Sequence, residues 1–222
     1  MAKSNGNGKE KENKPTGKAG QLTRTMHARA FESLAYQLLE TELGGVQVYQ
    51  TALTCAVNDD LREEWEKYLD ETKKHVQIAR GLLETCGLDP DKEHPARRIV
   101  RHIGESLVKA MAMAKEEGDP DEAQLVAAEC VVHAETKDHL NWELLGLIAE
   151  KTSGDVSKAM KEAHQEVEKE EDHHIYHTTG WTRELWIDAL ALPAVLPPPE
   201  EEKDVETQIG AARAKQSRDD LL

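Results

Sequence analysis

The most informative segment of this chain reads Glu170-Glu171-Asp172-His173-His174-Ile175. Its surroundings have the periodicity of a helix, in which residues three positions apart lie on one face with Cβ atoms roughly 5–6 Å apart. Glu171 and His174 can therefore reach a single ion between packed helices. A carboxylate and an imidazole at this spacing indicate a metal site in the interior of a helical bundle.

Three other segments repeat this chemistry. Residues Glu71-Thr72-Lys73-Lys74-His75-Val76 again combine a carboxylate with a histidine. Glu42 and Glu135 are each followed seven residues later by an aromatic side chain, Tyr49 or Trp142. Seven residues make about two helical turns, so the acid and the aromatic residue project the same way. These echoes predict a duplicated two-helix unit.

Composition narrows the function. The net charge of −15 would repel nucleic acid and anionic membrane surfaces. No apolar run in the sequence approaches the length of a membrane span. The isolated cysteines Cys55, Cys86 and Cys130 favour buried thiols in a reducing compartment over a disulfide framework. We therefore expect a soluble cytoplasmic protein with no nucleic-acid or membrane partner, whose clustered carboxylates favour cations.

Apolar periodicity and capping signals predict an all-α domain. Residues 1–24 are poor in apolar side chains and are expected to be disordered. A helical domain is predicted over residues 25–192, followed by a Pro- and Glu-rich tail over 193–222. Asp60 with Glu63, and Asp119 with Pro120, mark two helix starts. The predicted helices are Met26 to about Val57, Asp60 to Thr85 or Cys86, Ala96 to Glu117 with an apolar stripe of Ile99, Ile103, Leu107, Ala110 and Met111, Pro120 to about Lys151, and 155 to about Thr179 with a shorter continuation over Trp181 to Ala191.

The candidate residues are expected to lie at one level of the bundle. Glu42 and His75 lie almost equally far from the turn near Asn58, on either side of it. Glu135 and the Glu171–His174 pair stand in the same relation to the turn near Gly154. Any single Glu in a chain with 43 acidic residues is more often a solvated surface charge. The alignment of four segments favours a shared centre instead.

These motifs resemble those of the ferritin-like superfamily. Residues 170–175 are similar to the last ligand motif of rubrerythrins and manganese catalases, and residues 71–76 to their second. The layout also resembles the stress-associated YciF-type proteins. The resemblance implies a four-helix bundle with a helical crossover between the second and third main helices, and a centre holding two iron or manganese ions, with one ion as the alternative. It also implies terminal ligands Glu42 and Glu135, a bridging Glu171, and imidazole ligands His75 and His174.

The second motif departs from the family pattern. Thr72 stands where the family has a bridging carboxylate, and Glu71 is its neighbour. Glu71 shares a helix face with His75 at i and i+4, so it is a candidate replacement ligand. Without it, the centre would be mononuclear or degenerate. His139, four residues after Glu135, is a further candidate as a ligand or as an outer hydrogen-bond partner.

The resemblance implies reaction with dioxygen or peroxide, in oxidative stress or iron handling, by ferroxidase, peroxidase or catalase chemistry. A homo-oligomer is expected. The alternative is a structural or storage bundle with a vestigial site, whose C-terminal tail docks onto a partner; the departure at Thr72 favours it. A hydroxylase acting on an organic substrate would need a large apolar channel, for which aromatic residues, at 4% of the chain, are scarce.

Overall fold

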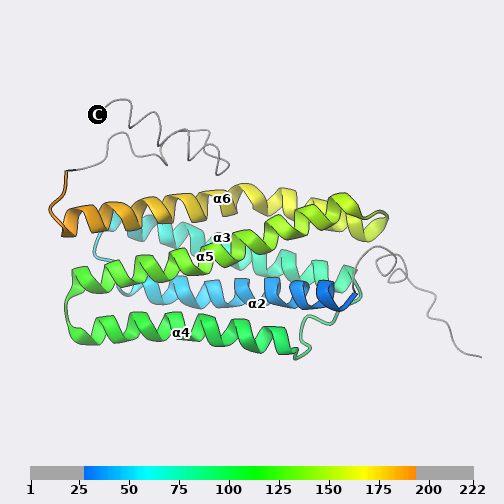
Figure 1. The fold of residues 1–222 in the computed structure, drawn as a ribbon, viewed down its shortest axis with the longest axis horizontal. Coiled ribbons are helices and arrows are strands. Elements are labelled where there is room, and N and C mark those ends of the chain that lie inside the picture. The colour runs from blue at the N-terminus through cyan, green and yellow to red at the C-terminus, as the bar shows by residue number, and fades with distance from the viewer. Residues whose placement is uncertain (1–27, 194–222) are drawn as a thin grey trace, which may run out of the picture.

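The computed structural model describes residues 28–193, and this part of the chain contains five α-helices and no strand (Figure 1). The predicted all-α class is therefore confirmed. The predicted disordered segment 1–24 and nearly all of the tail 193–222 lie outside the described residues. Between residues 28 and 193, no helix is both long and apolar enough to cross a membrane. The helices are α2 (Ala28–Leu53), α3 (Asp59–Thr85), α4 (Pro95–Glu117), α5 (Pro120–Lys151) and α6 (Asp155–Ala189).

Helix boundaries follow local capping chemistry. Asp119 caps α5 by accepting hydrogen bonds from the next backbone N–H groups, as its sequence predicted. Gly118, at φ 90°, turns the chain out of α4 in the left-handed region that favours glycine. The prediction of Asp60 as the cap of α3 is wrong, because Asn58 accepts from the backbone N–H of Leu61 and the helix begins at Asp59. The predicted break before Trp181 is also wrong, since α6 continues to Ala189.

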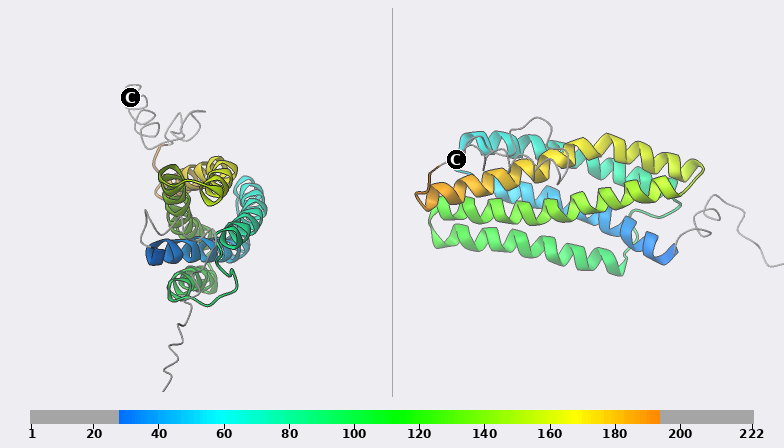
Figure 2. Two further views of the ribbon diagram at one scale, coloured as in Figure 1. Left: turned by 90° about the vertical axis from the view of Figure 1, so that its right-hand side faces the viewer. Right: turned by 45° about the horizontal axis from the view of Figure 1, so that its top comes forward.

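The helices form two hairpins joined by α4. The hairpin α2–α3 lies beside the hairpin α5–α6, and the contacts of α2 with α5 and of α3 with α6 close a ring around a shared interior (Figure 2). Helix α4 lies outside this ring, against α2 and α5. Helix α4 runs back along the bundle and so connects the end of the first hairpin to the start of the second. The predicted helical connection between the second and third long helices is therefore present.

The interior is divided into two apolar regions. Buried residues from the first part of α2, the second half of α3 and the α5–α6 turn form one cluster, which includes Leu38, Leu83 and Met160. The second part of α2, the start of α3 and the start of α5 form the other, which includes Trp65 and Val131. Between the two clusters runs a buried layer of acidic and histidine side chains. Burying polar and charged side chains in this layer costs free energy, which the burial of the apolar side chains on both sides must offset.

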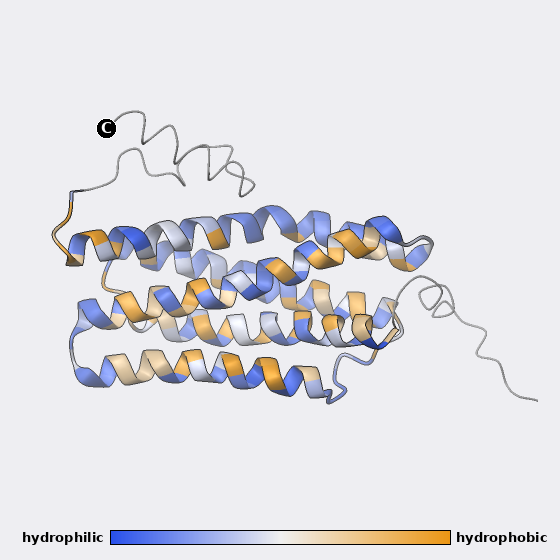
Figure 3. Cartoon of the chain, viewed as in Figure 1, coloured by the Kyte–Doolittle hydropathy of each residue, from blue (hydrophilic) through white to orange (hydrophobic). Residues whose placement is uncertain are grey.

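Helix α4 packs against α2 through ion pairs as well as apolar contacts. Arg97 and Arg101 donate to the two oxygens of the buried Glu40 carboxylate at 2.5 and 2.6 Å. The predicted apolar stripe of α4 is only partly buried, because Met111 is 0% exposed whereas Ile99 and Ile103 are 64% and 55% exposed. Figure 3 shows apolar residues on the side of α4 that faces the viewer. Because α4 lies outside the ring, part of its apolar face has no covering element among the described residues.

Candidate metal centre

Two groups of buried side chains meet at the middle of the interior. Glu42, His75 and Glu171 form one group and Glu135, Glu171 and His174 the other; within each group one ligand atom per residue lies within 4.8 Å of the others. Each of the five residues is at most 3% exposed. The prediction that these segments meet at one level is confirmed. Four helices contribute, because Glu42 comes from α2, His75 from α3, Glu135 from α5, and Glu171 and His174 from α6.

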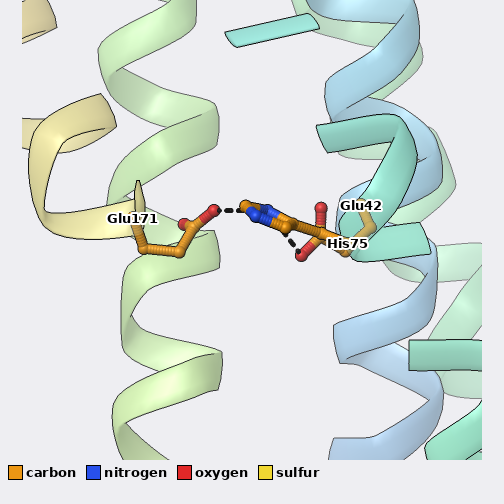
Figure 4. A group of neighbouring side chains, drawn as sticks. All are labelled: Glu42, His75 and Glu171. Carbon is orange, nitrogen blue, oxygen red and sulfur yellow. Dashed lines mark ion pairs between the residues drawn. The ribbon is translucent and has the colours of Figure 1, made fainter. Parts of the chain in front are cut away.

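Glu171 is the shared member of both groups. Its Oε1 atom lies 3.1 Å from Nδ1 of His75 and 3.5 Å from Nδ1 of His174. Nδ1 of His75 is also 3.7 Å from Oε1 of Glu42, and Figure 4 shows the imidazole between the two carboxylates. Nδ1 of His174 is 3.6 Å from Oε2 of Glu135. A single carboxylate between two imidazole–carboxylate pairs is the arrangement that a bridging ligand needs.

The inward-facing atoms lack hydrogen-bond partners. This is true of both carboxylate oxygens of Glu171, Oε2 of Glu42, Oε2 of Glu135, and Nδ1 of His75 and of His174, all of them shielded from solvent. The short distance from His75 to Glu171 does not have the alignment of a hydrogen bond. Leaving a buried polar atom without a partner costs about 1–3 kcal/mol. Buried atoms of this kind that converge on one place fit the donor set of a cation.

The outer ring nitrogen, Nε2, of each histidine contacts a carboxylate of the opposite hairpin. Nε2 of His75 lies 2.8 Å from Oε2 of Glu170, and Nε2 of His174 lies 3.0 Å from Oε2 of Glu71. Glu71 and Glu170 each precede the histidine of their own helix by four residues, so the two contacts are reciprocal. A carboxylate on the outer nitrogen fixes the ring orientation and leaves Nδ1 as the nitrogen that can bind a metal. The reciprocal contacts support the predicted duplication.

The aromatic residues that follow Glu42 and Glu135 also cross between the hairpins. Nε1 of Trp142 donates to Oε1 of Glu42 at 2.7 Å, and both side chains are buried. Tyr49 is fully buried beside Glu135 and His174. Burial raises the pKa of Tyr49, and the negative charge of Glu135 raises it further. The Trp142 hydrogen bond fixes the orientation of the Glu42 carboxylate before any ion binds.

The electrostatics of the group depend on which protons it holds. Burial lowers the pKa of His75, but the carboxylates of Glu171 and Glu42 outweigh it and raise that pKa to about 9. The pKa of His174 is likewise raised despite burial, by Glu135 and Glu171. Burial and repulsion from Glu171 raise the pKa of Glu42. The two imidazoles outweigh burial and lower the pKa of Glu171. Protons thus neutralise charge that cations can neutralise instead.

Two predicted ligands lie outside both groups. Glu71 contacts the outer nitrogen of His174, on the opposite side of the ring from Glu171. His139 pairs through Nε2 with Oδ1 of Asp172 at 2.9 Å, and its side chain is 31% exposed. The sequence could not separate these roles, because residues at i and i+4 share a face whether they bind an ion or a neighbouring ring.

The hydroxyl of Thr72 donates a hydrogen bond to the backbone oxygen of Tyr68, so it is not a member of the centre. Its methyl group instead packs against Gly45, where the Cβ atom of any larger residue would lie 3.2 Å from Cγ2 of Thr72. Helices α2 and α3 therefore approach each other closely at this glycine. Thr72 therefore occupies in the first hairpin the position that Glu171 has in the second, which makes the centre asymmetric.

Asp138 is a functional candidate that the sequence did not reveal. It is 4% exposed, and its Oδ1 atom is buried without a hydrogen-bond partner. Burial raises its pKa, and repulsion from Glu42 and then Glu171 raises it further. Its position three residues after Glu135 on α5 was the available signal, since i and i+3 share a face. Asp138 therefore adds a further buried carboxylate beside those of Glu42, Glu135 and Glu171.

Comparisons of this chain with protein families, with curated proteins and with solved structures find no match.

Proposed function

We propose that this protein is a ferritin-like metalloprotein whose buried centre holds two iron or manganese ions. The observation that carries this proposal is the convergence of unpartnered buried oxygen and nitrogen atoms on Glu171. Such atoms would be costly in a core whose only purpose is stability. The ring of two helical hairpins, with acids and histidines from every member at one level, supports the ferritin-like assignment.

The donor types favour iron or manganese. Imidazole and carboxylate together suit these metals, whereas thiolate ligands would favour zinc or copper, and all three cysteines are outside the layer. Glu42, Glu135, Asp138 and Glu171 supply four negative charges when ionised. Two divalent cations would balance these charges with both imidazoles neutral, and Asp138 would then supply the negative charge that Thr72 cannot supply.

The chain would bind and orient the ions, and the ions would supply redox chemistry toward dioxygen or peroxide. His75 and His174 would each offer Nδ1, with Glu170 and Glu71 keeping the rings in position. Glu171 would connect the two halves. Because the five inner residues are almost completely buried, the centre excludes bulk water, which strengthens every electrostatic interaction within it.

Metal analysis combined with a reaction assay tests the proposal. The purified protein is loaded anaerobically with Fe²⁺ or Mn²⁺, its metal content is measured, and it is mixed with dioxygen or hydrogen peroxide. We expect two ions per chain and consumption of the oxidant. Glu171→Ala is expected to lose both, whereas Glu162→Ala, an exposed position on the same helix, is expected to lose neither.

A structural or storage bundle is the second candidate, favoured by the missing carboxylate at Thr72. A purely structural bundle predicts a folded protein that binds neither ion, and Glu171→Ala then leaves every measured property except stability unchanged. Bound metal without oxidant consumption would support storage over catalysis. We also propose that the protein forms a homo-oligomer and that its C-terminal tail docks onto a partner, and both proposals are compatible with either function.

A further inference from the structure

A pair of histidines lies on the outer side of α6, apart from the buried centre. His173 and His177 are one turn apart, with ring centroids 5.3 Å from each other and planes tilted by 32°. His173 is exposed, and the side chain of His177 is 41% exposed. Two histidines at i and i+4 on one helix face can bind the same ion, as in helical zinc motifs. Neither residue belongs to the two buried groups.

The orientation of His177 is fixed by a carboxylate on α3. Nδ1 of His177 lies 2.7 Å from Oε1 of Glu64. Glu64 also accepts hydrogen bonds from the Tyr68 hydroxyl and from Nε1 of Trp181. Tyr and Trp act as the donors in these contacts, so Glu64 serves as an acceptor throughout and Nδ1 of His177 carries the hydrogen. Nε2 is then the nitrogen left for a ligand.

This arrangement matches the outer shell of known metal-binding histidines. A ligating imidazole usually donates its other ring N–H to a carboxylate, which fixes the tautomer and increases ligand basicity. The side chain of Glu64 is only 20% exposed, so it holds the ring more firmly than a solvated acid would. The contact therefore does for His177 what Glu71 and Glu170 do for the buried rings.

We propose that His173 and His177 form a second, surface metal site for a divalent transition ion of the copper, nickel or zinc class. Two imidazoles with water in the remaining positions suit these metals, whereas the oxygen-rich buried centre suits iron or manganese. The positive charges of Lys67 and Lys169 act on His173 and oppose cation binding. The ammonium of Lys67 lies 3.5 Å from Oε1 of Glu71 and is partly neutralised. This site does not depend on the proposed function of the buried centre.

Copper titration of the full chain tests the pair. Cu²⁺ is added to the wild type and to His173→Ala, His177→Ala and His102→Ala, and bound copper is followed by calorimetry and electron paramagnetic resonance. His102 is an exposed histidine on α4 and serves as the matched control. We expect each α6 variant to lose one equivalent of bound Cu²⁺ and the spectrum of a two-imidazole site, while His102→Ala retains both. Glu64→Gln should weaken that equivalent about tenfold.

Glu171→Ala separates this site from the buried centre, because the surface equivalent should persist when the centre is disabled. Wild-type copper binding in both His173→Ala and His177→Ala would overturn the proposal. Loss in His177→Ala alone would also overturn it, since the two rings would then not share an ion. The two variants change exposed or half-exposed side chains, so their folding can be checked by unchanged thermal midpoints.

Discussion

Replacing Glu71 by Gln distinguishes an outer hydrogen-bond partner from a direct ligand. The Glu71 carboxylate lies 3.0 Å from Nε2 of His174, and its side chain is 11% exposed. Gln keeps the volume and an acceptor oxygen but removes the charge. Loss of an outer partner of this kind weakens metal binding by about 10–100-fold, or roughly 1.4–2.8 kcal/mol. We expect the upper part of this range, and an unchanged number of bound ions.

Glu170→Gln is the matched control, because Glu170 makes the equivalent contact with His75 at 2.8 Å but is 37% exposed. Solvent screens its charge, so we expect a smaller loss of affinity. Competition with a chelator of known affinity measures both variants. Should Glu71→Gln bind half as many ions as the wild type, Glu71 is a direct ligand; should its affinity stay unchanged, the contact with His174 has no role in binding.

Three further predictions follow from the buried charges. Because the pKa of His75 is raised from 6.5 to about 9, its stabilising contribution is complete below pH 6.5 and is lost as the pH rises through about 9. The free energy of unfolding of chelator-treated protein should therefore fall by about 3 kcal/mol over this pH range, measured by thermal unfolding. A free energy that does not change with pH would contradict this. Arg97→Met should lower the thermal midpoint by about 6–12 °C and Arg101→Met should lower it by less. The reason is that the side chain of Arg97 is 8% exposed, whereas that of Arg101 is 37% exposed. Equal shifts of the two thermal midpoints would refute this ranking. Asp138→Asn should leave the midpoint of the metal-free protein nearly unchanged, since burial already favours the uncharged acid, yet weaken metal binding in the same chelator assay; an unchanged affinity would remove Asp138 from the centre.

Local signals in the sequence were sufficient for much of the fold. Asp119, Pro120 and Gly118 determine their turn through backbone chemistry that needs no distant partner. The exposure of Ile99 could not be predicted, because the periodicity of α4 does not show how many neighbours cover it. The start of α3 was missed for a different reason: Asn58 and Asp60 are both good capping residues, and only the chain path selects one of them.

The candidate site was predictable in position but not in detail. Equal distances from two turns place Glu42, Glu135 and Glu171 together whatever the side-chain rotamers. The role of Glu71 depends on which helix its carboxylate faces, and that is decided by the packing of α3 against α6. Asp138 was missed because it has no counterpart in the first hairpin, where Gly45 is the equivalent residue.

Anomalous X-ray diffraction from crystals loaded with Mn²⁺ or Fe²⁺ tests the central claim most directly. We predict two anomalous peaks in the interior, one bounded by Glu42, His75 and Glu171 and the other by Glu135, Glu171 and His174, with Glu171 contacting both. A loaded crystal with no anomalous peak between these residues, in a protein with the same arrangement of helices, would contradict the claim that this layer is a metal centre.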